Sequence, residues 1–134
     1  GGLVVATGLM VLYVADTAFS FISIEGHVIA GWITFSCFRD GDAMVVQVHP
    51  LFRPGDPLME FSFRIGAGGE EDRFWHRTLG NLAARLGLRG TVEQRDTLVD
   101  GRLQWGEASN ILLSAPVLSS FYMPVYLMKQ ALRR

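Results

Sequence analysis

The chain has 134 residues, of which 49% are hydrophobic and 19% charged, and its formal net charge is −1. This length fits one domain over residues 1–134, and the apolar composition excludes a disordered chain. Because there is no net basic field, we expect no nucleic-acid partner. The single Cys37 excludes an internal disulfide, so we expect a reducing, cytoplasmic location.

The first residues form an uncharged segment. The chain opens with Gly1-Gly2 instead of Met, and Leu3 to Ala15 carries no charge. This run lacks a basic leader and is shorter than the ~20 residues that a membrane-spanning helix needs. It predicts two buried strands separated near Thr7-Gly8, and the missing Met predicts that the natural N-terminus is absent.

Residues 1–65 are expected to be mainly strands, with hydrophobic alternation and turn residues as the signals. The expected strands are Leu9–Ala15, Phe19–Ile24, Gly31–Phe38 and Met44–His49. Phe19 and Phe21 share one face of their strand. Asp40-Gly41 favours a tight hairpin turn, so the strands are expected to be antiparallel. Cys37 lies in an apolar run and is interpreted as a small buried hydrophobic residue.

Three prolines follow this sheet, and proline cannot continue a hydrogen-bonded ladder. Pro50, Pro54 and Pro57 are therefore expected to end it. Leu58–Ile65 could be a short helix or another strand, and the alternation of its apolar residues favours the strand.

The second half is expected to be mostly helical. Residues 70–88 predict a helix, because acidic residues precede it and an apolar stripe of period 3.6 runs along it. Gly87 or Gly90 would end this helix. Residues 91–106 predict a hairpin around Val99-Asp100-Gly101, and residues 107–133 predict an apolar helix interrupted by prolines.

The stretch Ala108–Met128 has no charged residue, and Lys129, Arg133 and Arg134 follow it. Three interpretations stay open. The segment is a helix buried against the sheet, a helix in a membrane interface with its basic tail on anionic headgroups, or a membrane span.

His27 and Glu25 are the best candidates for acid–base catalysis, since a histidine near a carboxylate titrates close to neutrality. The alternative is a turn in which the imidazole caps backbone groups. A metal site is not expected, because His27, His49 and His76 lack ligand spacing. No P-loop or nucleophile elbow is present, and no cofactor is expected.

A ligand site is predicted from the aromatic and apolar strand residues, for which core packing is the alternative. Arg53 could clamp a carboxylate or phosphate, or form a salt bridge with Asp42 or Asp56. The candidate ligand-binding residues are Arg53, Trp32, Phe35, Met44, Val46, Val48 and Phe52.

A set of short motifs over residues 9–58 resembles domain-of-unknown-function family 1990. The motifs are Val11-Leu12-Tyr13-Val14-Ala15-Asp16, Phe19-Ser20-Phe21, Gly26-His27, Gly31, Phe35, Val48 and Phe52-Arg53-Pro54. The resemblance implies a helix-grip, START-like fold, in which an antiparallel sheet curls around a C-terminal helix and encloses an apolar cavity. Trp32 and Ile33 stand where the family has acidic residues, which favours binding over catalysis at the Gly-His turn.

These observations predict an α+β, helix-grip-like domain with a curved antiparallel sheet and a C-terminal helix. Its expected role is to bind a hydrophobic small molecule or lipid. The alternatives are a membrane-associated accessory subunit that docks on a membrane or protein partner through residues 108–134, and a cyclase- or hydrolase-type enzyme that uses His27.

Overall fold

The computed structural model describes residues 7–88 and 90–132, apart from the side chains at 67 and 68. The chain divides into two compact units, Gly1–Met59 with Gln104–Arg134, and Glu60–Leu103. One domain over residues 1–134 stays a prediction. The α+β class, with an open antiparallel sheet and C-terminal helices, is confirmed.

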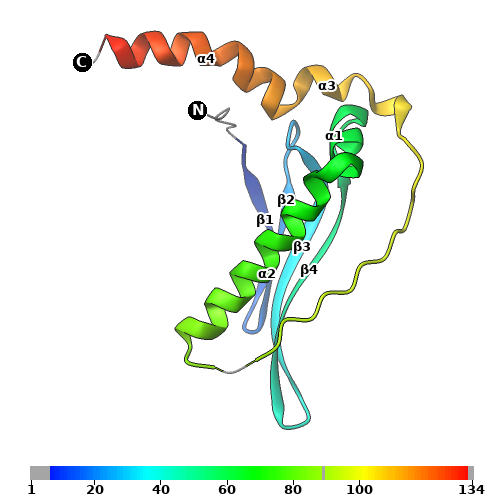
Figure 1. Cartoon of the computed structure of the whole chain (residues 1–134), viewed down its shortest axis with the longest axis vertical. Helices are drawn as coiled ribbons and strands as arrows, with labels where there is room; N and C mark the ends of the chain where they lie inside the picture. The colour runs from blue at the N-terminus through cyan, green and yellow to red at the C-terminus, as the bar shows by residue number, and fades with distance from the viewer. Residues whose placement is uncertain (1–6, 89, 133–134) are drawn as a thin grey trace. The chain divides into compact units, whose positions relative to one another are not determined.

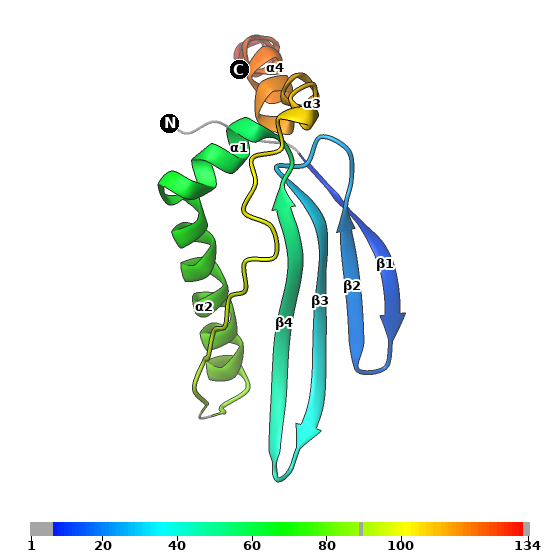
Figure 2. The same cartoon turned by 90° about the vertical axis from the view of Figure 1, so that its right-hand side faces the viewer.

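The first unit contains a four-stranded antiparallel sheet (Figure 1). Its strands are β1 (Leu9–Ala15), β2 (Ala18–Ser23), β3 (Ile29–Asp40) and β4 (Ala43–Pro54), and they lie side by side in chain order. Two-residue loops join β1 to β2 and β3 to β4. In the β3–β4 loop, Gly41 adopts the positive φ of +59° that such a tight turn requires. The long β3–β4 hairpin extends past the β1–β2 turn (Figure 2). All four expected strands are therefore confirmed.

The register sets which side chains share a face of the sheet. Phe19 pairs with Phe35, and Phe35 pairs with Val48, so these three residues lie on one face. Ser20, Thr34 and His49 form the neighbouring row on the opposite face. The predicted alternation within β2 and β4 is confirmed.

The two edges of the sheet correct two expectations. Strand β1 is an exposed edge strand, not a buried one; the Leu3–Ala6 part of that prediction falls outside the described residues. Pro50 lies inside β4 and does not end it. A proline fits there because β4 is also an edge strand, where a missing N–H need not break a ladder.

The segment after β4 is helical, so the favoured strand over Leu58–Ile65 is wrong and its alternative, a short helix, is confirmed. Helix α1 spans Pro57–Ser62 and is followed by the π-helical turn η1, Phe63–Ala67. The Asp56 carboxylate accepts hydrogen bonds from the N–H groups of Leu58 and Met59, at 2.8 and 2.9 Å. A capping Asp followed by proline favours helix initiation, and this local preference overrides the period-2 alternation.

The second unit contains helix α2, Gly68–Arg85, which confirms the predicted helix. Gly87, with φ +66°, ends it, because its N–H and that of Leu88 bond back to the carbonyls of Ala84 and Ala83. Within the described residues 90–104 there is no strand, so the expected hairpin over 91–106 is wrong. An isolated two-stranded hairpin is marginal without a further strand or helix against it.

The C-terminal part of the first unit is a series of three helices. They are the 3₁₀ helix η2 (Trp105–Glu107), α3 (Asn110–Leu113) and α4 (Ala115–Ala131). Ser114 is extended and separates α3 from α4, and Pro116 lies in the first turn of α4 while Pro124 lies inside it. Phe121 and Tyr122 are 78% and 70% exposed, so the interpretation of this segment as a buried helix is wrong.

Candidate functional site

One face of the sheet is apolar and carries a cluster of three phenylalanines. The rings of Phe19 and Phe35 stack with centroids 4.8 Å apart, and Phe21 meets both edge-on at 5.5 and 6.1 Å. We call this surface the apolar face. By register it comprises Leu9, Val11 and Val14 of β1, Phe19 and Phe21 of β2, Ile33, Phe35 and Cys37 of β3, and Met44, Val46, Val48, Pro50 and Phe52 of β4.

The structure brings together five of the seven predicted ligand-binding residues. They are Phe35, Met44, Val46, Val48 and Phe52, all on the apolar face. Met44 and Val46 are exposed, whereas the other three are half-buried. Trp32 and Arg53 project from the opposite face, since they pair with Leu51 and Ala30. Cys37, expected to be buried, is a half-buried free thiol on the apolar face.

A different arginine stands on the apolar face. Arg39 pairs with Met44 near the β3–β4 turn, and both its position and its exposure place a guanidinium at one end of the face. Guanidinium groups bind carboxylates and phosphates in a two-pronged geometry. The alternation from Phe35 to Arg39 is visible in the sequence, so strand periodicity was the signal that could have identified this residue.

Arg53 has no ion pair with either expected partner, as far as the described residues extend. The Asp56 carboxylate caps α1 and is only 3% exposed. Asp42 lies in the turn at the far end of β4 from Arg53, so the strand length separates the two. The salt-bridge alternative for Arg53 is therefore wrong.

The face opposite to the apolar one carries polar residues at its centre. The hydroxyl groups of Ser20 and Thr34 are hydrogen-bonded across β2 and β3 at 2.7 Å, and Ser20 is buried. His49 stands opposite Thr34 on β4 and is exposed. By register this face also carries Ile22, Trp32, Phe38, Val45 and Leu51, so its polar centre is what distinguishes it from the apolar face.

The Gly26-His27 turn joins β2 to β3 and is tied by short-range hydrogen bonds. Nδ1 of His27 lies 3.1 Å from the N–H of Ile29, which donates to it. A second hydrogen bond crosses this turn. The Gly31 N–H donates to Oγ of Ser23 at 2.9 Å. Glu25 and His27 are both described, and no hydrogen bond or ion pair joins them. The imidazole therefore has the backbone-capping role that was the alternative to catalysis.

A small pocket lies beside this turn, with a volume of about 190 Å³. Its lining comes from the turn, the start of β1 and the α3–α4 junction, and consists of Thr7, Gly8, Ile24, Glu25, Gly26, Leu113, Ala115 and Leu118. Ligand pockets for drug-sized molecules are typically about 300–1,000 Å³, so this one is small for a lipid.

Neither a metal site nor a membrane span is found in the part of the chain that the structure describes. No three His, Cys, Asp or Glu side chains gather there closely enough to hold a metal ion. His27, His49 and His76 lie on a turn, on β4 and on α2. None of the described helices is long and apolar enough to cross a membrane.

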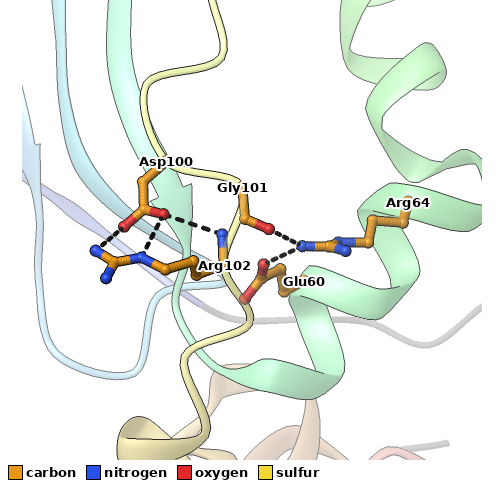
Figure 3. A network of polar contacts seen from close by, with 5 residues as sticks. All are labelled: Glu60, Arg64, Asp100, Gly101 and Arg102. Atoms are coloured by element: carbon orange, nitrogen blue, oxygen red, sulfur yellow. Dashed lines mark hydrogen bonds and ion pairs between the residues drawn. The ribbon is translucent and has the colours of Figure 1, made fainter.

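The second unit has its own polar network (Figure 3). The Arg64 guanidinium donates to the Glu60 carboxylate at 2.9 Å and to the Gly101 carbonyl at 2.6 Å, which fixes the coil onto the end of α1. Asp100 accepts from both the backbone and the side chain of Arg102. Each acid is paired with a base, so this network has a structural role.

Helix α2 carries a carboxyl group with a shifted pKa. Burial raises the pKa of Glu71 above its ordinary value of 4.5, the Trp75 side chain lowers it, and the charge of Asp72 raises it. Because burial is the largest cause, the shift bears on the stability of the fold.

No known protein family, no curated protein and no solved structure matches this chain. Membership of the family that the motifs resemble stays a prediction.

Proposed function

We propose that this protein is a non-catalytic module that binds a hydrophobic small molecule or lipid on the apolar face of its sheet. The observation that carries the proposal is the composition of that face, where all four strands contribute apolar residues around the Phe19–Phe21–Phe35 cluster. Covering apolar surface is favourable by about 25 cal/mol per Å². A hydrocarbon chain laid on this face would gain that free energy.

The position of Arg39 narrows the class of ligand. Its guanidinium stands at the end of the apolar face next to Met44, where it can pair with an acidic headgroup. A fatty acid combines a hydrocarbon chain with such a headgroup. We therefore propose an anionic lipid of this class, with Arg39 in the orienting role that the sequence suggested for Arg53.

The test measures binding of a fluorescent fatty-acid analogue to variants matched across the two faces. Val46 and Gln47 are both exposed neighbours on β4 that point to opposite faces. Val46→Glu should weaken binding at least tenfold, and Gln47→Glu should leave it unchanged. Likewise Arg39→Gln should weaken binding, whereas Arg53→Gln should not. Equal binding by Val46→Glu and Gln47→Glu would overturn the proposal, as would the absence of any binding.

Helix α4 supports a second candidate function, that of an accessory subunit at the periphery of a membrane on its cytoplasmic side. An apolar stripe with alternating spacings of three and four residues runs along the helix, and all its members are exposed. The stripe consists of Leu118, Phe121, Val125, Met128 and Leu132. Lys129 and two further arginines follow near the chain end, and such basic residues favour an anionic membrane surface.

Vesicle flotation tests this candidate with the complete chain. We expect it to float with vesicles of phosphatidylcholine and phosphatidylserine more than with phosphatidylcholine alone. Phe121→Ser should reduce flotation, and Leu127→Ser, on the other side of the helix, serves as the control. Equal flotation of the two variants would count against the membrane interface.

A further inference from the structure

The outer edge of β1 is an uncharged strand edge with no partner among the described residues. β1 pairs with β2 alone there, and its sequence Leu-Met-Val-Leu-Tyr-Val-Ala contains neither charge nor proline. Residues 9–14 are all between 49% and 69% exposed. Proteins usually protect an exposed edge strand with lysine, proline or a covering segment, because its free N–H and C=O groups bind other strands.

The opposite edge of the same sheet has that protection. β4 carries Pro50 and Pro54 within the strand, and Arg53 and His49 are exposed beside them. Prolines remove donors from the edge, and charged side chains oppose pairing. The β1 edge, whose only such device is a bulge at Leu12, is therefore the less protected of the two.

We propose that β1 pairs in antiparallel fashion with β1 of a second copy of this chain, so that one sheet runs through a dimer. Each residue of β1 is about half exposed, and pairing covers part of this surface, an interface smaller than the ~800 Å² per partner of a standard-size complex. The apolar faces of the two copies would join at Val11 and Val14. This inference is independent of the proposed ligand.

A bulge in β1 limits the possible registers of the pairing. Val11 stands opposite Phe21 and Tyr13 opposite Ser20, so Leu12 is an extra residue. Beyond the bulge the alternation of faces is reversed: Val11 and Val14 lie on the apolar face, while Met10, Tyr13 and Ala15 lie on the other.

Residues that stand opposite each other in a sheet must share a face. A two-fold axis through Leu12 would place Val11 opposite Tyr13, which lie on different faces. An axis between Leu12 and Tyr13 places Val11 opposite Val14 and Met10 opposite Ala15, and both pairs then match. An axis between Val11 and Leu12 matches as well, since it places Leu9 opposite Val14 and Met10 opposite Tyr13. The dimer proposed here uses the axis between Leu12 and Tyr13, and cross-linking distinguishes the two registers.

Disulfide trapping in a Cys37→Ser background tests the register. Two single variants, Val11→Cys and Val14→Cys, should form a covalent dimer when they are mixed and oxidised. Neither should do so alone, since each introduced thiol is three residues from its own symmetry mate, too far for a disulfide. A mixture of Val11→Cys and Tyr13→Cys is the control and should not cross-link.

Sedimentation equilibrium of the complete chain tests the dimer itself. Val11→Lys should raise the dimer dissociation constant at least tenfold, and Val46→Lys, on the same face but at the protected edge, should not. A wild-type chain that is monomeric at tens of micromolar overturns the proposal, and so does a dimer that Val11→Lys leaves intact. Cross-linking of the control pair overturns the register. A chain that dimerises but binds no fatty-acid analogue would contradict only the proposed function and leave the dimer proposal standing.

Discussion

The backbone N–H of Ala115 donates a hydrogen bond of 2.7 Å to the carbonyl oxygen of Gly26. This contact joins the first residue of the last helix to the β2–β3 turn, 89 positions earlier in the chain. Nearby, the Asn110 side chain donates to the Gly55 carbonyl at 3.2 Å. Ser114, Ala115, Asp56 and Pro57 are buried, so this junction is the best-packed part of the first unit.

Gly26→Ala should loosen the junction. Gly26 has φ +80°, and a Cβ there would lie 2.6 Å from the Leu113 carbonyl oxygen, so both the backbone and the neighbour oppose a side chain. We expect a loss of about 1–3 kcal/mol in the free energy of unfolding, measured by urea denaturation.

Gly41→Ala is the matched control for this change. Gly41 has φ +59°, but a Cβ there meets no atom within 4 Å, so only the backbone term of about 1 kcal/mol applies. Equal losses for the two variants would show that the contact with Leu113 does not matter.

Asp56→Ala should remove the cap of α1. The carboxylate accepts from two backbone N–H groups, and the residue is 3% exposed, so its loss leaves buried donors without a partner. We expect about 1–2 kcal/mol lower stability in chemical denaturation. Asp56→Asn retains an acceptor oxygen and should therefore keep most of the stability that Asp56→Ala loses. If Asp56→Asn loses as much stability as Asp56→Ala, the negative charge of Asp56 stabilises the fold and not its role as a hydrogen-bond acceptor.

His27→Ala and His27→Asn separate a structural from a catalytic histidine. An Asn side chain can accept the Ile29 N–H that Nδ1 now accepts, as Asn does in Asx turns. Thermal unfolding should show a loss of about 1 kcal/mol for Ala and a smaller one for Asn. If His27→Ala is as stable as the wild-type protein, the imidazole has no structural role.

Glu71→Gln should alter how stability depends on pH. Because the pKa of Glu71 is raised in the folded state, the folded chain holds this proton more tightly than the unfolded chain does. The wild-type protein therefore loses stability as pH rises from about 4.5 through the folded pKa, and the Gln variant lacks this loss. The effect should be about 1 kcal/mol or less, since the group is only half-buried.

Melting temperatures measured at pH 4 and pH 8 check this pH dependence. The stability of Glu71→Gln relative to wild type should be higher at the upper pH. Glu70→Gln provides the control, because Glu70 is exposed and pairs with Arg73. A pH-independent difference for Glu71→Gln would contradict the assignment.

Local sequence patterns were enough to locate the strands, the turns between them and the main helix. Alternation located Leu9–Ala15 and the Met44–His49 part of β4, and Gly87 was a visible helix end. These features depend on neighbours within a few residues, which is why local patterns identify them. The Asp56-Pro57 start of α1 was equally local, but the alternation after it favoured the wrong element.

Which residues share a surface depends on strand pairing and became visible only in the folded chain. Trp32 and Arg53 are separated from the predicted ligand set, and Arg39 joins it, because pairing between strands fixes each residue's face. The exposure of β1 follows from its place at the sheet edge. The hydrogen bond between His27 and Ile29 follows from the fold of the turn that contains them. Strand order and long-range contacts depend on residues distant in the chain, so hydrophobic pattern alone could not reveal them.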